Sequence, residues 1–434
     1  MSSIWVKEAI EKPSFNRLEG DIKTDVLIIG GGIAGILCAY ELKEAGVDFV
    51  LVEKSEICSG VTQNTTAKIT LQHGLIYDKM IRRFGKEKAE LYVSAQKSAL
   101  EKYKTLCQKI DCDYENKDAF LYSLNDEKSL EKEAAACQGI GIKADITKKT
   151  ELPFKVACAV RVGNQAQFNP LKFLYEISKE LPIYENTKVL ELKGTEAITQ
   201  YGKIKAEKIV VATHFPFLNK HGSYYLKMFQ HRSYVLSLEG AENINGMYVD
   251  MEDKGLSFRT YKKSLLLGGG GHRTGKTGGG YKELERFAQE HYNDAIITGR
   301  WATQDCMTLD DVPYIGIYSQ NTPNLFVVTG FNKWGMSSSM VGARVIRDII
   351  KNGKSEYAPI FLPSRTILRP QLFINTFETA KNFVTPTSPR CPHLGCALKY
   401  NKEEHSWDCP CHGSRFNENG EVLNNPATDD LKRK

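Results

Sequence analysis

The sequence lacks any long apolar run. No stretch of its 434 residues approaches the roughly 18 consecutive apolar residues that a membrane helix needs. Residues 1–15 mix Lys7, Glu8, Glu11 and Lys12 with few apolar side chains, which indicates neither a secretory signal nor an Arg-rich transit peptide. We therefore expect no integral membrane segment and a cytoplasmic location.

Segregated charge is also missing. The net charge is +6, but 58 Lys and Arg residues are interspersed with 52 Asp and Glu residues along the chain. Proteins that bind polyanions gather their basic residues into patches, so we expect no nucleic acid partner. With 41% hydrophobic residues, the chain has enough apolar surface for two or three globular units.

Cysteine is sparse over most of the chain and concentrated near its end. Seven of the 11 cysteines are scattered between Cys38 and Cys306. The other four lie close together near the end: Cys391, Cys396, Cys409 and Cys411. Scattered cysteines are usually buried thiols. A cluster in a cytosolic protein is more often a metal site than a disulfide framework.

A glycine-rich turn lies within a strand-helix-strand pattern, which runs through a strand at 25–29, the turn, a helix at 36–45 and a strand at 49–52. Gly30 allows the tight turn, Gly32 lets a pyrophosphate approach the helix amino end, and Gly35 permits close contact between helix and strand. Glu53 then closes the second strand, where a carboxylate accepts hydrogen bonds from ribose hydroxyls. The pattern predicts a dinucleotide site, for either NAD or FAD.

Later segments resemble, in the same order, those of the D-amino-acid-oxidase superfamily of FAD-dependent oxidoreductases: Cys58–Thr70, Gln72–Gly74, Gln167–Leu174, Asn186–Val189, Ile209–His214 and Asn324–Ser339. The resemblance covers about residues 25–350 and favours FAD. It implies a second helix amino terminus that stabilises negative charge on reduced flavin. Besides Gly30, Gly32, Gly35 and Glu53, the implied cofactor contacts are Ile33, Ala34, Lys54, Thr65, Thr66, Lys68, Val189, Gly330, Met336 and Ser337.

The same resemblance implies an α/β fold: a Rossmann-like FAD-binding domain of the glutathione-reductase type, interleaved with an antiparallel-sheet α+β substrate domain. The segments 92–147 and 217–299 are too long to be loops and should form the substrate domain, which covers the flavin like a roof. The FAD-binding domain should then comprise residues 1–91, 148–216 and 300–365.

A small amine, amino acid or hydroxy compound is the substrate class that the resemblance implies, held between roof and flavin. Side chains that could hold it are Arg232, Arg259, Tyr261, His272 and Trp334. Of these, Arg232, Tyr261 and Trp334 are the candidates for a catalytic role. The alternative for each is ordinary packing or solvation.

The segment Gly270–Thr277 matches the P-loop pattern letter for letter. A P-loop lysine and threonine must open a helix, but the glycines 278–280 follow directly. We therefore predict a loop between a roof strand and a helix at 282–291. A nucleotide-switched binding protein built on this segment is the alternative from another functional class.

Two short segments near the end, Cys391–Cys396 and Cys409–Phe416, resemble the ligand loops of a Rieske protein. The resemblance implies a 2Fe-2S cluster with Cys391 and Cys409 on one iron and His393 and His412 on the other. Two neutral imidazoles in place of thiolates raise the reduction potential. A structural zinc site built from the same residues is the alternative.

The Rieske resemblance further implies a disulfide between Cys396 and Cys411, which in the cytosol needs shelter from the reducing pool. A complete Rieske domain has several strands before its first ligand loop. Here residues 366–390 instead predict a linker, with a helix at 372–384 and a Thr-Pro-Thr-Ser-Pro turn. We therefore expect a small, incomplete all-β module at 391–434.

These predictions combine into one enzyme. Its FAD should oxidise a small molecule, and the electrons should leave through the cluster to an acceptor that the sequence does not identify. The alternative is a flavin oxidase that gives its electrons to dioxygen and has a zinc-bound or metal-free tail.

Overall fold

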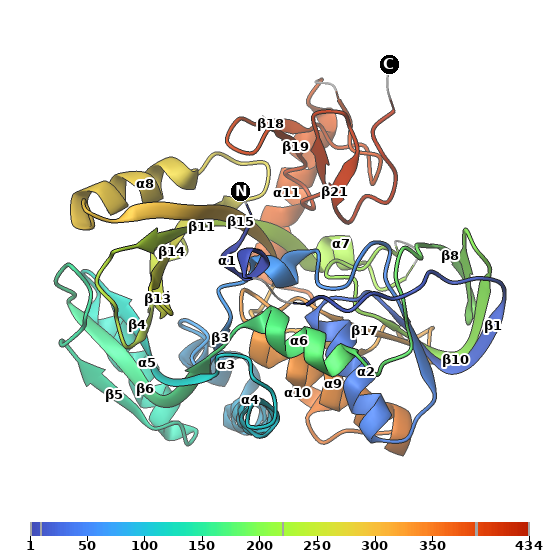
Figure 1. Ribbon diagram of the computed structural model, residues 1–434, viewed down its shortest axis with the longest axis horizontal. Coiled ribbons are helices and arrows are strands. Elements are labelled where there is room, and N and C mark those ends of the chain that lie inside the picture. The colour runs from blue at the N-terminus through green and yellow to red at the C-terminus, as the bar shows by residue number, and fades with distance from the viewer. Residues whose placement is uncertain (1, 9–10, 219–220, 387–388, 433–434) are drawn as a thin grey trace.

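The computed structural model describes residues 2–8, 11–218, 221–386 and 389–432, whose strands form three sheets (Figure 1). The first sheet has eight strands, and its main path runs in the order β16-β17-β10-β1-β2-β7. Its members are β1 (Ile22–Ile29), β2 (Phe49–Val52), β7 (Ile183–Tyr184), β8 (Val189–Lys193), β9 (Glu196–Thr199), β10 (Lys203–Val211), β16 (Tyr314–Ile317) and β17 (Leu325–Thr329). Strands β7, β2, β1, β10 and β17 are parallel, so their carboxyl ends meet at one edge, where nucleotides bind in such sheets.

The second sheet has nine strands, and nearly all of its pairings are antiparallel. It comprises β3 (Lys68–Ile69), β4 (Glu115–Ser123), β5 (Ala144–Thr147), β6 (Cys158–Gln167), β11 (Met228–Glu239), β12 (Met247–Asp250), β13 (Ser257–Tyr261), β14 (Ser264–Arg273) and β15 (Ile296–Thr308). Strands β6 and β15 come largely from ranges predicted for the FAD-binding domain. Sheet membership alone does not fix domain limits, so the domain ranges stay a prediction.

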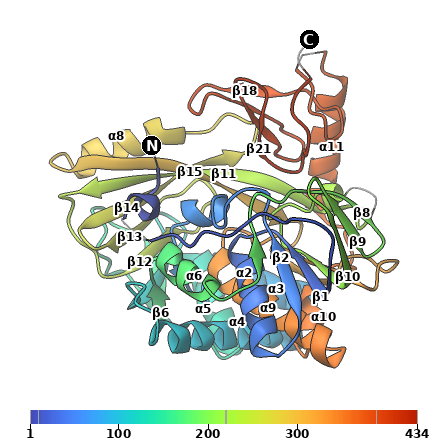
Figure 2. The same cartoon turned by 45° about the vertical axis from the view of Figure 1, so that its right-hand side comes forward.

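The third sheet is small and antiparallel, and it stands above the long strands of the second sheet (Figure 2). Its strands are β18 (Lys399–Asn401), β19 (Ser406–Asp408), β20 (Arg415–Asn417) and β21 (Val422–Asn424). Before the first ligand loop, the described part of residues 366–390 forms a helix and no strand, as predicted. Thr387 and Ser388 of the predicted turn lie outside the described residues.

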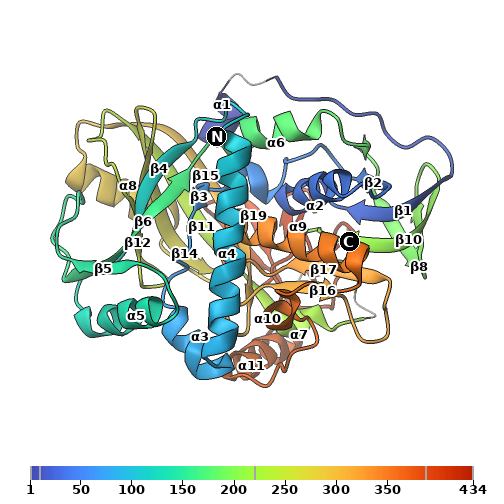
Figure 3. The same cartoon turned by 90° about the horizontal axis from the view of Figure 1, so that it is seen from below.

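Helices cover both large sheets, and the long α4 crosses the molecule beside α9 (Figure 3). They are α1 (Ile4–Lys7), α2 (Ile33–Glu44), the 3-10 helix η1 (Val61–Asn64), α3 (Tyr77–Phe84), α4 (Lys86–Cys107), α5 (Glu127–Gly139), α6 (Pro170–Ser178), α7 (Tyr224–Lys227), α8 (Gly280–His291), α9 (Gly335–Asn352), α10 (Ala358–Phe361) and α11 (Pro370–Val384). Helix α2 packs on α9, where Glu41, only 1% exposed, pairs with Arg347 and Lys102.

Local sequence signals account for these elements. Strand β1 is apolar and buried along its second half because it lies between β2 and β10 and has a hydrophobic cluster packed on each of its faces. Asn169 is the N-cap of helix α6, and its side chain accepts hydrogen bonds from the backbone N–H groups of Leu171 and Lys172. Strand β14 extends to Arg273, so the P-loop-like segment begins within a strand; it leads to α8, and its lysine and threonine open no helix, as predicted.

Candidate functional site

The turn after β1 leaves a surface that a phosphate group can approach. A Cβ atom at Gly35 would lie 1.8 Å from the carbonyl oxygen of Gly30, and one at Gly30 would lie 2.7 Å from that of Ala212. Both glycines are therefore required by the turn itself. A Cβ at Gly32 would meet only the Thr62 hydroxyl, at 3.3 Å, so this position borders open space.

A central cavity of about 1010 Å³ opens beside this turn and reaches the second sheet. The predicted cofactor residues that line it are Gly30, Gly32, Ile33, Ala34, Glu53, Lys54, Thr65, Thr66, Lys68, Val189 and Met336. Helix α9 begins at its wall with Gly335 and Met336, in the position expected for a helix amino terminus that favours negative charge. The arrangement fits a flavin dinucleotide.

Three predicted cofactor residues, Gly35, Gly330 and Ser337, are not among the lining residues of the cavity and pack behind its wall. Gly35 holds α2 against β1, and Gly330 packs where a Cβ would lie 2.4 Å from the Thr308 side chain. The Ser337 hydroxyl lies 3.0 Å from Nε2 of His73, which lines the cavity and stacks on Trp334 at 5.0 Å between ring centroids. Burial lowers the pKa of His73 to about 3, so its ring is neutral.

The sheet end of the cavity carries polar groups that sequence reasoning did not single out. Thr303 and Asp305 alternate along β15 and both line the cavity, together with Lys333. Burial raises the pKa of Asp305 to about 6, against the lowering effect of Lys333. Among the described residues, Thr303 Oγ1 is a buried atom without a hydrogen-bond partner. The alternating Thr-x-Asp spacing in the strand was the available signal.

Of the five substrate candidates, Trp334 lines the cavity. The structure places the others against protein groups. Arg232 pairs with Glu404 of the C-terminal region, and the Tyr261 hydroxyl donates to Asp113 at 2.7 Å. Arg259 Nη1 donates to the carbonyls of Thr66 and Ala67, and His272 Nε2 lies 3.0 Å from the Tyr234 hydroxyl. Their role in catalysis stays a prediction.

The two predicted ligand loops meet above the second sheet. The thiols of Cys391 and Cys409 are buried and hydrogen-bonded to each other, and this bond lowers the pKa of Cys391 to about 7. The rings of His393 and His412 lie 5.1 Å apart between centroids. Burial lowers the pKa of His412 to about 3, and its Nδ1 is a buried atom without a hydrogen-bond partner in the described residues. Two thiols and two neutral imidazoles fit the ligand set of a Rieske cluster.

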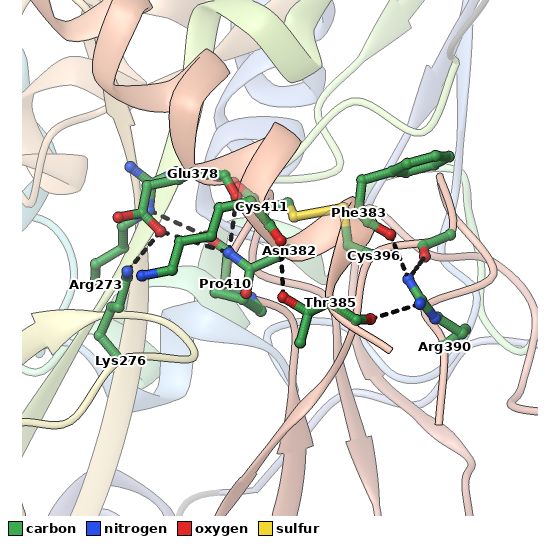
Figure 4. The surroundings of a disulfide bond; sticks show 12 residues. Arg273, Lys276, Glu378, Asn382, Phe383, Thr385, Arg390, Cys396, Pro410 and Cys411 are labelled. Atoms are coloured by element: carbon green, nitrogen blue, oxygen red, sulfur yellow. Dashed lines mark hydrogen bonds and ion pairs between the residues drawn. A yellow bond between two sulfur atoms is a disulfide. The ribbon is translucent and has the colours of Figure 1, made fainter. Parts of the chain in front are cut away.

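A disulfide joins the two loops between Cys396 and Cys411, as the resemblance implied (Figure 4). The Sγ atoms of these two residues and Cys409 lie within 4.8 Å of one another, so the sulfur atoms of the module are concentrated at one point. Both disulfide residues are buried, which shelters the bond from solvent reductants.

Strands β11 and β15 separate the central cavity from the ligand loops. Ser233 of β11 pairs with Thr303 of β15, and both line the cavity. Gln230 and Gln304 of the same two strands point to the module: their amides donate to the carbonyls of His412 and Gly413, each at 2.8 Å. A single layer of sheet therefore lies between the cavity and the second ligand loop.

The P-loop-like segment binds the same loop from the side. Arg273 donates to the carbonyls of Pro410 and Cys411, at 3.1 and 3.0 Å. A Cβ at Gly275 would lie 2.6 Å from the backbone nitrogen of Pro410. The glycine allows this close approach, so the segment serves in contact between the modules.

The C-terminal region also forms part of the cavity wall. Residues 422–425, 427–428 and 430 line the cavity. Asn425 Nδ2 donates to the carbonyl of Thr213 at 2.9 Å, and Lys188 Nζ donates to that of Thr428 at 2.7 Å. Sequence reasoning missed this contact, since neither segment carries a pattern that identifies its partner.

Comparison with known proteins agrees with this geometry. The family model described as FAD dependent oxidoreductase matches residues 25–349, and the Rieske [2Fe-2S] domain model matches residues 366–433. The chain belongs to the FAD dependent oxidoreductase family and carries a C-terminal Rieske domain. It is an FAD-dependent oxidoreductase with FAD and a 2Fe-2S cluster as cofactors.

Relatives share either the whole arrangement or one part of it. The YhfW protein of Bacillus subtilis (strain 168) is 35% identical over 98% of this chain and 96% of its own length. It is described as a Rieske 2Fe-2S iron-sulfur protein. That alignment runs over 490 positions, so the relative carries residues that this 434-residue chain lacks. The cytochrome b6-f iron-sulfur subunit of Fritillaria agrestis is 51% identical over 37 residues, 8% of this chain and 16% of its own length.

Solved structures share the fold of the larger part. L-proline dehydrogenase from P. horikoshii superposes with a TM-score of 0.67 at 17% identity, covering 80% of this chain and 98% of its own. Glycine oxidase from Geobacillus kaustophilus gives 0.67 at 18% identity, covering 80% and 99%. Across the described helices, none combines the length and apolar character required to cross a bilayer.

Proposed function

We propose that this flavoenzyme dehydrogenates a small amine, amino acid or hydroxy compound and passes the electrons through its cluster to a separate acceptor. FAD supplies hydride acceptance, and the Rieske cluster supplies one-electron transfer at raised potential. The observation that carries the proposal is the single sheet layer between the cavity and the second ligand loop. Strands β11 and β15 line the cavity with some side chains and donate hydrogen bonds to that loop with others.

The chain's own residues prepare the cavity for a substrate. Trp334 and His73 form a neutral aromatic pair on one wall, and the hydroxyl of Thr303 offers a hydrogen bond on another. Asp305, with its pKa raised to about 6 by burial, holds or accepts a proton near neutral pH. Such a group suits a substrate amine or hydroxyl that must lose a proton as it is oxidised.

The substrate class is tested by anaerobic mixing with glycine, L-proline and a small 2-hydroxy acid, while flavin absorbance is followed. We expect at least one of them to bleach the flavin. If none does, the proposed substrate class is wrong.

The electron route is tested in the same protein by photoreducing the flavin without oxygen and recording the cluster by electron paramagnetic resonance. Cluster reduction should follow flavin reduction at a rate independent of protein concentration, as expected for transfer within one molecule. If the cluster stays oxidised, and if oxygen added afterwards is reduced to stoichiometric peroxide, the oxidase alternative holds instead.

A further inference from the structure

Helix α11 turns its polar side toward the protein. Its two buried residues are Asn375 and Asn382, each 4% exposed. Asn375 accepts a hydrogen bond from Arg273 at 2.8 Å. Glu378 pairs with Lys276 at 2.5 Å (Figure 4). A surface helix ordinarily buries its apolar stripe and exposes its polar one. In α11 this arrangement is reversed.

The outward side of α11 is correspondingly apolar. Nine large apolar side chains in the described residues are more than half exposed, and six of them lie within residues 368–384. These six form what we call the α11 apolar face: Leu368, Phe373, Ile374, Phe377, Phe383 and Val384. Phe373, Phe377 and Val384 follow the helical period and are 69%, 68% and 76% exposed. A concentrated apolar patch of this kind marks a binding surface.

The charges beside this face are positive. Lys381 and Arg390 are exposed, whereas Glu378, the one acidic residue in the α11 sequence, is directed inward to Lys276. Arg390 donates to the carbonyls of Phe383 and Gly395, at 2.8 and 3.0 Å, and so fixes the end of the helix to the first ligand loop (Figure 4). The face therefore combines apolar side chains with cations and is continuous with the loop that carries His393.

We propose that the α11 apolar face docks on an anionic lipid surface. Phenylalanine and isoleucine side chains would enter the boundary between headgroups and acyl chains, and Lys381 and Arg390 would meet anionic headgroups. A protein partner would need hydrogen bonds across the interface, about one per 100–200 Å². The outward side of α11 offers few groups for them, mainly Thr376 and Lys381, whereas a bilayer requires none. The docking does not depend on the proposed substrate or electron route.

The experiment is co-sedimentation of the full-length holoprotein with phosphatidylcholine vesicles, with and without about one third phosphatidylglycerol. The wild type should bind the anionic vesicles, bind less as salt rises, and bind neutral vesicles weakly. In the double variant Phe373→Ser/Phe377→Ser, affinity for anionic vesicles should fall by about 100-fold or more, because each buried phenylalanine contributes about a factor of ten or more. Lys381→Glu should weaken binding to anionic vesicles and leave neutral vesicles unaffected.

Ile296→Ser is the matched control. Ile296 is 70% exposed at the start of β15, away from α11, so its loss should leave vesicle binding unchanged. Retained flavin and cluster absorbance in each variant shows that the fold is intact. The proposal is overturned if the wild type stays in the supernatant, if the double variant binds as well as the wild type, or if the face instead mediates self-association that the double variant abolishes.

Discussion

At the scale of single residues, we expect two glycines of the dinucleotide motif to have different roles: Gly35 is required for folding, and Gly32 is required for cofactor binding. Gly35 is enclosed by backbone, while Gly32 borders the cavity with only the Thr62 hydroxyl near its missing Cβ. A side chain at Gly35 therefore collides with the protein. A side chain at Gly32 collides with whatever occupies the cavity.

We predict that Gly32→Val abolishes flavin binding and leaves the protein folded, because the added methyls fill the space that a pyrophosphate needs. Flavin absorbance after gel filtration measures the first effect, and circular dichroism the second. Gly35→Val, the matched control, should fail to fold. Full flavin occupancy in Gly32→Val would show that the phosphates lie elsewhere.

The buried ring of His412 allows a second prediction. Replacing a neutral imidazole ligand with a thiolate stabilises the oxidised cluster, so His412→Cys should lower the reduction potential, on the order of 100–200 mV. Potentiometric titration followed by visible absorbance measures the shift. An unchanged potential with an intact cluster would exclude His412 as a ligand.

At the scale of elements, the paired strands β11 and β15 have two functions. One face forms the cavity wall, and the other holds the second ligand loop through Gln230 and Gln304, each 1% exposed. Because successive side chains of a strand point to opposite faces, a single pair of strands can do both.

Removing the amide at position 304 should therefore disturb the contact with the module and spare the flavin. In Gln304→Leu the carbonyl of Gly413 loses a buried donor, which costs about 1–3 kcal/mol. We expect slower cluster reduction after flavin photoreduction, with unchanged flavin content. Gln138→Leu is the control, since Gln138 makes a similar bond of 2.7 Å to the carbonyl of Ala144 far from the module. Equal effects of both variants would contradict the prediction.

The segment that leads to α11 is held by one buried ion pair. Arg365 donates two hydrogen bonds to Asp310, at 2.7 and 2.8 Å. Burial favours the neutral carboxyl, but the charge of Arg365 outweighs it and the pKa of Asp310 lies below its usual value. The stabilisation is thus fully present above the usual Asp pKa of about 3.9 and is lost as the pH falls through the lowered pKa.

Asp310→Asn should destabilise the protein by about 3 kcal/mol at pH 7, since it leaves the buried Arg365 without a counter-charge. The difference from the wild type should begin to shrink below about pH 4, where Asp310 of the unfolded chain takes up a proton, and should be smallest below the lowered pKa, where native Asp310 is protonated too. Urea unfolding across this pH range measures it. A difference that stays constant with pH would rule out the ion pair as the cause.

At the scale of the whole molecule, the sequence allows prediction of each cofactor site but not of how the two sites meet. The β-α-β turn and the ligand loops are short patterns that local chemistry requires, and both are found where predicted. Gln230 and Gln304 are single polar residues in strands, and their roles depend on segments more than 100 residues away. The same limit explains why the contact between Arg232 and Glu404 could not be predicted.

The shared cavity wall predicts a result for truncation. Deleting residues 389–434 removes the side chains at 422–430 that line the cavity. FAD affinity should fall by roughly tenfold or more, equivalent to at least about 1.4 kcal/mol of lost contacts. Equilibrium dialysis of the truncated and full-length proteins measures it. Equal affinities would show that the Rieske domain contributes nothing to flavin binding.

The position of residues 422–430 in that wall also determines the order in which the cavity is completed during protein synthesis. They leave the ribosome after every other segment that encloses the cavity, so a nascent chain that has completed its β-α-β turn still has an open cavity. Flavin retained by the finished enzyme is therefore sealed in only when the Rieske domain has folded against Lys188 and Thr213. A cell short of iron or sulfide, in which that domain matures slowly, should consequently accumulate chains that have lost flavin as well as cluster.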